Sequence, residues 1–260
     1  MHENGERTGT WTVRRTGDGS PTLAHPDHGQ ACHSDIGAWF EACERYVKPC
    51  QLAQRAARAN ARPVRLLDVG TGPGWNLAAA LAFVEDAGGV LEVWTLEHDP
   101  SVLHEMIATF EREPLDTEHA RRHVPIRGAL REALASGSAT SLGHRSRLHL
   151  YLGDARETIR RLPGEVRFDA VFLDPFSPRV EPALWSRAFL ANVAKRMAAG
   201  SWLSTYSTSL DVSVALTAAG LNVGSGPPVG RKSGSLASPD LQPPALDART
   251  LRKIARRLLL

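Results

Sequence analysis

The chain has 260 residues, 42% of them hydrophobic and 23% charged, and its formal net charge is +3. These proportions indicate a globular protein with one substantial domain and at most a small appendage. No apolar run approaches the length of a membrane span and no charged-then-apolar leader opens the chain, so we expect no membrane contact and a cytoplasmic protein.

The three cysteines lie in the first fifth of the chain, at Cys32, Cys43 and Cys50. An odd count in a cytoplasmic protein indicates free thiols rather than a disulfide framework. Cys32, His33 and Cys43 offer metal-ligand atoms, but no CxxC pair accompanies them. We therefore expect no metal site.

Composition divides the chain into three parts. Residues 1–33 are polar and rich in Gly, Thr and His, which predicts an irregular N-terminal extension with short strands around Trp11–Arg15 and Pro21–Ala24. Residues 34–238 carry the apolar segments of the main domain. Residues 239–260 predict a Pro-rich linker followed by a basic C-terminal helix.

Within the main domain, buried strands alternate with helices. A helical stretch from Ser34 to about Asn60, broken or kinked at Pro49, comes first. The predicted strands are Val64–Gly70, Leu91–Asp99, Arg147–Ala155, Phe168–Leu173 and Ser201–Ser207. The predicted helices are Leu77–Gly88, Ser101–Arg112, Arg127–Leu134, Glu157–Pro163, Pro182–Met197 and Leu210–Ala219. Two short strands follow between residues 221 and 238.

This order predicts an α/β fold, a doubly wound Rossmann-like parallel sheet with helices on both faces. The last two strands are too close in sequence for a helical crossover, so we expect them to form an antiparallel hairpin at the edge. Ligands bind such sheets at the carboxyl ends of the strands.

The first strand of the sheet ends in DVGTGPGWN, with Gly70, Gly72 and Gly74 in a GxGxG pattern. Glycines there let the backbone turn tightly and approach a ligand without Cβ clashes. A nicotinamide fingerprint, GxGxxG, would have its third Gly where Trp75 stands. The turn therefore favours a ligand without a pyrophosphate, although nicotinamide binding stays open.

Acidic residues stand at four successive strand ends, at Asp68, Glu97, Asp154 and Asp174. Each taken singly is as readily a helix cap or a solvated turn, but the four together form the layout of S-adenosylmethionine sites. In that layout Glu97 binds the ribose hydroxyls and Asp154 the adenine amine, while the glycine turn faces the methionine part. We therefore expect a methyltransferase.

The fourth strand, FDAVFL, ends on Asp174 and opens the turn DPFSP. If the methyl acceptor is a primary amine, the site must hold it unprotonated, because such an amine is mostly protonated at neutral pH. Asp174 is placed at the strand end to accept hydrogen bonds from an acceptor amine and to orient its lone pair. Phe176 offers a ring face to a base or to the cationic donor. Pro175 and Pro178 stiffen the turn. Tyr206, at the end of the fifth strand, is a candidate for the opposite wall, with a core tyrosine as the alternative.

Six segments in order resemble the methyltransferase domain of the MnmC family, most closely its stand-alone form without the oxidase half. They are DGSPTL (Asp18–Leu23), HSDIGAWFEACERYVKPC (His33–Cys50), LDVGTGPGWN (Leu67–Asn76), FLDPFSPRVEPALWS (Phe172–Ser186), LSTYS (Leu203–Ser207) and GRKSGSLA (Gly230–Ala237). The similarity covers about Asp18 to Ala237.

The resemblance implies a class I enzyme that methylates the 5-aminomethyl group of wobble uridine in tRNA, forming 5-methylaminomethyl-2-thiouridine, with S-adenosylmethionine as donor. It implies further cofactor contacts from Glu41 and Asn76, and RNA contacts from Arg179, Arg231 and Lys232. The expected partner is the anticodon stem-loop of tRNA, with no obligate protein partner. FAD is not expected, because the chain has no room for the flavin-dependent half.

Methylation of the uracil ring itself would need a cysteine to attack C6. No Cys follows Cys50 and none ends a predicted strand, which favours an exocyclic amine as the acceptor. Three alternatives remain: methylation of another amine on a small molecule or protein, aminopropyl transfer from a decarboxylated relative of the same donor, and cofactor binding without turnover.

The C-terminal helix begins near Asp247 and carries cations on one face and apolar residues on the other. The cations are Arg249, Arg252, Lys253, Arg256 and Arg257, opposite Leu251, Ile254 and Leu258. Both phosphate binding and simple docking as a surface helix fit this pattern.

Overall fold

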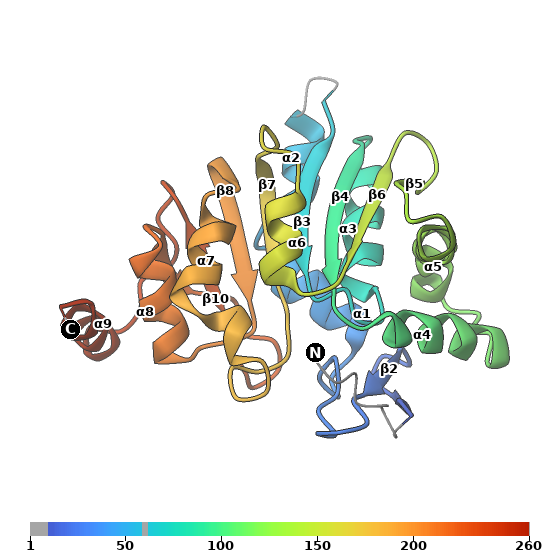
Figure 1. Cartoon of the computed structure of the whole chain (residues 1–260), viewed down its shortest axis with the longest axis horizontal. Coiled ribbons are helices and arrows are strands. Elements are labelled where there is room, and N and C mark those ends of the chain that lie inside the picture. The colour runs from blue at the N-terminus through green and yellow to red at the C-terminus, as the bar shows by residue number, and fades with distance from the viewer. Residues whose placement is uncertain (1–9, 59–61, 260) are drawn as a thin grey trace, which may run out of the picture.

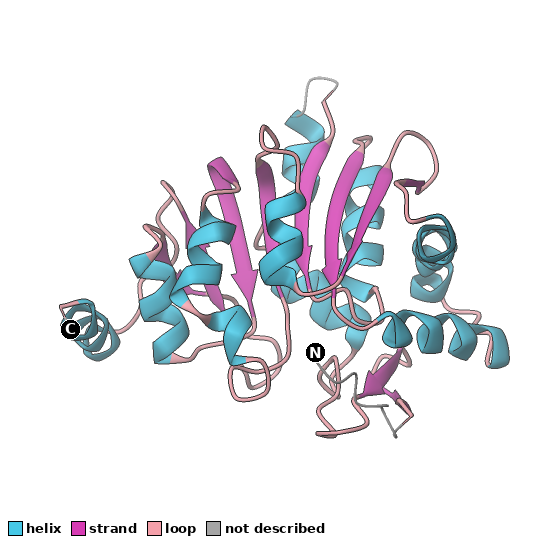
Figure 2. Ribbon diagram, in the orientation of Figure 1, coloured by secondary structure: helices cyan, strands magenta, loops and turns pink. Residues whose placement is uncertain are grey.

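A mixed sheet of eight strands forms the centre of the described part of the chain (Figures 1 and 2). The computed structural model describes residues 10–58 and 62–259. The strand order is β5-β6-β4-β3-β7-β8-β10-β9. The strands are β3 (Val64–Val69), β4 (Leu91–Glu97), β5 (Thr140–Ser141), β6 (Arg147–Leu152), β7 (Phe168–Leu173), β8 (Met197–Thr205), β9 (Asn222–Ser225) and β10 (Ser235–Ser238).

The central strands β6, β4, β3, β7 and β8 run parallel, which confirms the predicted doubly wound sheet. β10 pairs antiparallel with both β8 and β9, so the expected antiparallel edge is present. β5, which the sequence did not predict, pairs antiparallel with β6 at the other edge. Its two residues are too few to give a periodic pattern.

Helices cover both faces of the sheet. They are α1 (Ala38–Glu41), the π-helical η1 (Ala42–Val47), α2 (Leu52–Arg58), α3 (Trp75–Asp86), α4 (Pro100–Arg112), α5 (Glu118–Ser136), α6 (Ala155–Arg161), the 3-10 helix η2 (Pro182–Trp185), α7 (Arg187–Ala194), α8 (Leu210–Ala218) and α9 (Ala248–Leu258). In Figure 1, α6 and α7 lie in front of the sheet, with α2 and α3 behind it. Neighbouring strand residues therefore enter different cores: Leu66 packs with α3 to α5, and Leu67 packs with α6 to α8.

The polar segment after residue 113 contains a longer helix than predicted. The sequence predicted Arg127–Leu134, whereas α5 runs from Glu118 to Ser136 with Pro125 inside it. Proline was taken as a helix breaker. Burial of Ile126 and neighbouring apolar residues stabilises the helix across the proline, and the Thr117 side chain caps its first turn.

Another prediction, one helix over Pro182–Met197, is wrong. The segment divides into η2 and α7, because the Ser186 hydroxyl accepts a hydrogen bond from Phe189 N (3.3 Å) and starts a new helix. Met197 already pairs with Phe168, so β8 begins four residues before the predicted strand.

The helical stretch after Ser34 is broken at Pro49, as predicted, but its central turn is π-helical. Lys48 N donates to Cys43 O (3.0 Å), a hydrogen bond that spans five residues instead of four. The predicted end at Asn60 lies outside the described residues.

The predicted N-terminal strands are present as β1 (Thr12–Arg15) and β2 (Pro21–Ala24), and the structure shows that they pair antiparallel, while residues 1–9 lie outside the described residues. The pair lies beneath the carboxyl ends of β3 and β4 (Figure 1). The indole of Trp75 donates a hydrogen bond to Pro21 O (2.8 Å). No helix among the described residues is long and apolar enough to cross a membrane.

Candidate active site

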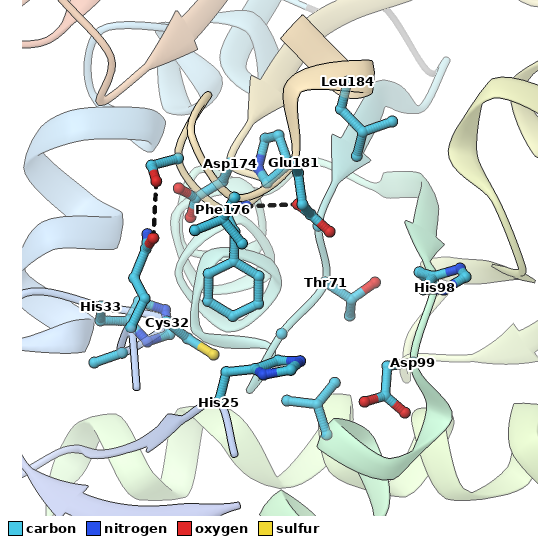
Figure 3. A pocket seen from close by; sticks show the side chains of 18 of the residues that line it. His25, Cys32, His33, Thr71, His98, Asp99, Asp174, Phe176, Glu181 and Leu184 are labelled. Atoms are coloured by element: carbon cyan, nitrogen blue, oxygen red, sulfur yellow. Dashed lines mark hydrogen bonds between the residues drawn. The ribbon is translucent and has the colours of Figure 1, made fainter. Parts of the chain in front are cut away.

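A cavity of about 870 Å³ opens at the carboxyl ends of the central strands. That volume lies within the usual range of small-molecule sites, roughly 300–1,000 Å³. Its wall comes from the turn after β3, the ends of β4, β7 and β8, and the N-terminal segment around residues 25–35 (Figure 3).

The glycine turn after β3 forms one side of the cavity. Gly70 has a φ of 92°, and a Cβ there would lie 2.7 Å from Asp174 O, so no larger residue fits. Gly72 lines the cavity and donates its N–H to Glu97 Oε2 (2.9 Å). Gly74 does not line the cavity; it has a left-handed conformation before α3 and packs against Ile126 of α5.

Glu97 lines the cavity at the end of β4. Its two oxygens accept from Gly72 N and from Asp99 N (both 2.9 Å), which fixes the carboxylate in place. Burial raises the pKa of Glu97, with these backbone hydrogen bonds acting in the opposite direction. The remaining lone pairs suit ligand hydroxyls.

Asp154 also lines the cavity, but its carboxylate is already occupied. It caps α6 and accepts from the guanidinium of Arg156 through Nε (3.0 Å) and Nη2 (2.5 Å). These hydrogen bonds lower the pKa of Asp154. A ligand amine at this position would have to share the carboxylate with Arg156.

Asp68 lies beneath the cavity and does not line it. One of its oxygens accepts from Thr95 Oγ1 (2.6 Å), and the other has no hydrogen-bond partner among the described residues. Burial raises the pKa of Asp68 to about 7. The expectation that Asp68 touches the cofactor therefore finds no support in its placement.

Asp174 stands at the end of β7, facing the cavity (Figure 3). The Tyr46 hydroxyl donates to Oδ1, and Asn76 Nδ2 donates to Oδ2 (2.8 Å). Burial raises the pKa of Asp174 well above its usual value, although both donors oppose the shift. Asn76 does not line the cavity and acts on it through Asp174.

The turn after Asp174 is fixed by hydrogen bonds from several directions. Phe176 N donates to Glu181 Oε2 (2.8 Å), and the Trp185 indole donates to Phe176 O (2.8 Å). Tyr206 OH donates to Pro175 O (2.9 Å), so Tyr206 supports the turn as well as lining the cavity. The aromatic turn is thus rigid before any ligand binds.

Phe176 projects into the cavity on the side of His25 (Figure 3) and packs with three rings from the N-terminal segment. The centroid of the Phe176 ring lies 4.7 Å from that of His28, 5.5 Å from that of His25 and 6.4 Å from that of Trp11. This cluster could not be predicted from the sequence, because Phe176 is far in the chain from the other rings and the segment that carries them was predicted to be irregular.

The π-helical turn brings Glu41 and Arg45 to the cavity. Glu41 accepts from Ser34 N (2.9 Å) and from Arg45 Nε (3.3 Å), while Arg45 Nη2 donates to Lys232 O (3.0 Å). Arg45 Nη1 is buried without a hydrogen-bond partner among the described residues. Sequence analysis missed Arg45, because the 3.6-residue periodicity does not apply in a π-helix.

Cys32 lines the cavity beside Gly72, which corrects the inference that no cysteine is near the site. Burial, with the charges of Glu97 and Asp174, raises the pKa of this thiol well above its usual value. Since the thiolate is the nucleophile, Cys32 is not activated for attack on a uracil ring. No group of three or more His, Cys, Asp or Glu side chains within residues 10–58 and 62–259 could hold a metal ion.

The residues expected to contact RNA are only partly at the cavity. Lys232 lines it, whereas Arg179 and Arg231 are exposed and lie one residue away from the lining residues Val180 and Lys232.

Comparisons with known proteins agree with this geometry. Residues 125–239 match the family of S-adenosyl-L-methionine-dependent methyltransferases. The chain is 30% identical over 246 residues to the uncharacterized protein MJ0670 of Methanocaldococcus jannaschii, covering 92% of this chain and 63% of that protein. It is 43% identical over 122 residues to the tRNA 5-methylaminomethyl-2-thiouridine biosynthesis bifunctional protein MnmC of Aromatoleum aromaticum, covering 44% of this chain and 18% of that protein.

Among solved structures, that of MNMC2 from Aquifex aeolicus superposes with a TM-score of 0.77 at 29% identity, covering 99% of this chain and 78% of that chain. The chain spans 63% of the length of MJ0670 and 18% of the length of the MnmC protein, less than two thirds in each case.

Proposed function

We propose that the chain, an MnmC-like methyltransferase domain that depends on S-adenosylmethionine, methylates the 5-aminomethyl group of wobble uridine in tRNA, forming 5-methylaminomethyl-2-thiouridine. The observation that carries the proposal is Asp174, a cavity-facing carboxyl held by Tyr46 and Asn76 at the end of β7. The name of the bifunctional relative supports tRNA as the substrate.

The cavity residues fit the donor. Gly70 and Gly72 leave the space that a Cβ would fill, and Glu97 offers fixed acceptors to ribose hydroxyls. Glu41, which lines the cavity, suits the α-ammonium of the donor. Bound S-adenosylmethionine supplies a methyl group on a positively charged sulfur.

In this proposal Asp174 takes the proton from the acceptor amine and orients it. The site must take a proton from the ammonium form to free the nitrogen lone pair for attack. A carboxylate whose pKa is raised by burial is a stronger base than one in water, and Asp174 is such a group. Tyr46 and Asn76 hold its oxygens so that the remaining lone pairs face the cavity.

Phe176 and the basic residues serve the RNA in this proposal. Sequence-specific RNA enzymes splay a base out of its stack and hold it against aromatic rings. Phe176, fixed at both its N–H and its carbonyl, provides such a ring. Lys232 at the cavity, with Arg179 and Arg231 beside it, would contact phosphates of the anticodon stem-loop.

The test uses a methyl-labelled donor with tRNA carrying the aminomethyl wobble base, followed by nucleoside analysis. We expect label in 5-methylaminomethyl-2-thiouridine and none in tRNA that lacks the aminomethyl group. Label in the second tRNA, or transfer to a polyamine instead, would contradict the proposal.

A further inference from the structure

The C-terminal helix α9 presents a face of unpaired cations. At about 100° per residue, Arg249, Arg252, Lys253 and Arg256 fall within an arc of roughly 100°. All four are exposed, and none forms an ion pair with another described residue. Arg257, at the margin of this arc, pairs with Asp211 of α8.

The other arginine-rich part of the chain is different. On α4 and α5, Arg112 pairs with Glu105, Arg121 with Asp116, Arg122 with Asp86 and Arg131 with Glu111. Those cations are neutralised by neighbouring acids, so α9 differs from these two helices in presenting four cations that pair with no described residue.

The body of the protein holds α9 in place. Asp247 caps it by accepting from Arg249 N (2.9 Å) and Thr250 N (3.0 Å), and Ile254 is buried on the side that packs on α8. Figure 1 shows α9 as the outermost element beyond α8. The cationic face is therefore fixed and turned to solvent.

We propose that this face of α9 binds the phosphate backbone of the RNA substrate. The inference rests on the proposed function for the identity of the RNA, and it adds a second contact surface, away from the cavity. Four unpaired cations on one rigid face are complementary to a polyanion, and binding would release condensed counterions. The surface lies beyond residue 239, where the match to the methyltransferase family ends.

A membrane surface is the other polyanion that a basic helix can meet. Helices of that kind insert a free apolar face among the lipids. On α9, Ile254 is 5% exposed and packed against the protein, whereas Leu251 and Leu258 are exposed to 46% and 38%. Both leucines lie on the same side of the helix as Ile254, opposite the cations, so the face turned outward is cationic and not apolar. RNA is therefore the better match.

The test compares two variants with equal charge loss. One is Arg249→Gln/Arg252→Gln/Lys253→Gln/Arg256→Gln; the control is Arg112→Gln/Arg121→Gln/Arg122→Gln/Arg131→Gln. The dissociation constant of a tRNA transcript with uridine at the wobble position is measured between 50 and about 200 mM KCl. We expect the α9 variant to bind the tRNA at least about tenfold more weakly than wild type at low salt. The plot of the logarithm of the association constant against the logarithm of the salt concentration should become less steep, by about 2–4 in slope. The control should stay within about twofold of wild type.

Methyl transfer to aminomethyl tRNA provides the second readout. In the α9 variant the KM for tRNA should rise while kcat and the donor dissociation constant stay unchanged. Equal salt slopes in the α9 variant and wild type, or equal losses in both variants, would overturn the proposal. The proposal would also be overturned if the α9 variant lost binding to phosphatidylserine vesicles while its affinity for tRNA stayed at the wild-type value. If wild type binds tRNA but does not methylate it, the proposed function fails while the salt slopes still decide the role of α9.

Discussion

At the scale of single residues, the site depends on carboxyl groups that burial keeps from ionising easily. Asp174 and Glu97 both have raised pKa values, and both face the cavity. A cation in the cavity reverses this effect, because an opposite charge nearby favours the ionised carboxylate. The cavity is thus suited to a ligand that carries positive charge, whether a donor or an amine.

Tyr46 should set the pH at which Asp174 becomes active. Its hydrogen bond lowers the pKa of Asp174, so Tyr46→Phe should raise that pKa and move the acid limb of the kcat/KM profile to higher pH. Asp174→Asn should lower kcat by at least about 100-fold with a donor dissociation constant within a few-fold of wild type. Tyr206→Phe is the matched control for Tyr46→Phe, since the Tyr206 hydroxyl donates to Pro175 O and not to Asp174. An unshifted limb in Tyr46→Phe would show that Asp174 is not the titrating base.

Asp68 should lower the free energy of unfolding as the pH rises. Its pKa is about 7 in the folded chain against an ordinary 3.8, so between these values the folded state holds a proton that the unfolded state has lost. The free energy of unfolding then falls with rising pH, by up to about 1.4 kcal/mol per pH unit from this group. Asp68→Asn should remove that slope, as measured by denaturant unfolding from pH 4.5 to about 8.

Asp18→Asn serves as the comparison for this experiment. Burial acts to raise the pKa of Asp18, but hydrogen bonds from Ser20 and Phe40 lower it overall. Its stabilising effect is present above the unfolded pKa, so the loss in Asp18→Asn should be constant over the same range. A constant difference for Asp68→Asn as well would mean that Asp68 is ionised throughout.

At the scale of elements, strands that end in the site were predictable and the segments that cover it were not. Phe168–Leu173 is apolar at every position except Asp169, and that pattern identified β7 and the acid that follows it. The π-helical turn and the first half of α5 escaped prediction, because the turn departs from the 3.6-residue period and α5 contains Pro125. Both are stabilised by packing against α3, a contact that no local pattern records.

Trp75 links α3 to the N-terminal strands and explains why no third glycine follows the turn. Trp75→Phe removes the donor to Pro21 O and leaves that carbonyl unpaired, which should cost about 1–3 kcal/mol in the free energy of unfolding. Trp202→Phe is the control, because its buried indole N–H has no partner among the described residues. Denaturant unfolding of both variants checks the difference; equal losses would assign the effect to volume alone.

At the scale of the whole molecule, the cavity joins segments that are remote in sequence. Residues near positions 30, 70, 97, 154, 175 and 232 all line it. The strand ends among these residues could be predicted to lie together, because parallel strands end at the same edge of a sheet. The aromatic rings of the N-terminal segment and the position of Arg45 depend on long-range packing, so the sequence could not place them.

The whole protein should distinguish a sulfonium ligand from a neutral thioether in a pH-dependent way. S-adenosylmethionine should raise the melting temperature more than S-adenosylhomocysteine does, because ionised carboxylates at Glu97 and Asp174 favour a cation in the cavity. Since both pKa values are raised, these carboxyls take up protons as the pH falls, and the gap between the two shifts should narrow toward acid pH. Thermal unfolding at matched ligand concentrations measures this. A pH-independent gap would show that these groups do not sense the sulfur charge.

Arg45 supports both the cavity and the loop around Lys232. Its Nε donates to Glu41 Oε1 (3.3 Å) at the cavity and its Nη2 donates to Lys232 O (3.0 Å). Gly234 leaves room for the guanidinium, since a Cβ there would lie 2.6 Å from Nη1. A ligand that moves Glu41 must therefore also change the position or stiffness of the loop around Lys232. If that loop binds RNA, as proposed, the affinities for donor and RNA are linked, and by thermodynamic reciprocity each alters the other by the same factor.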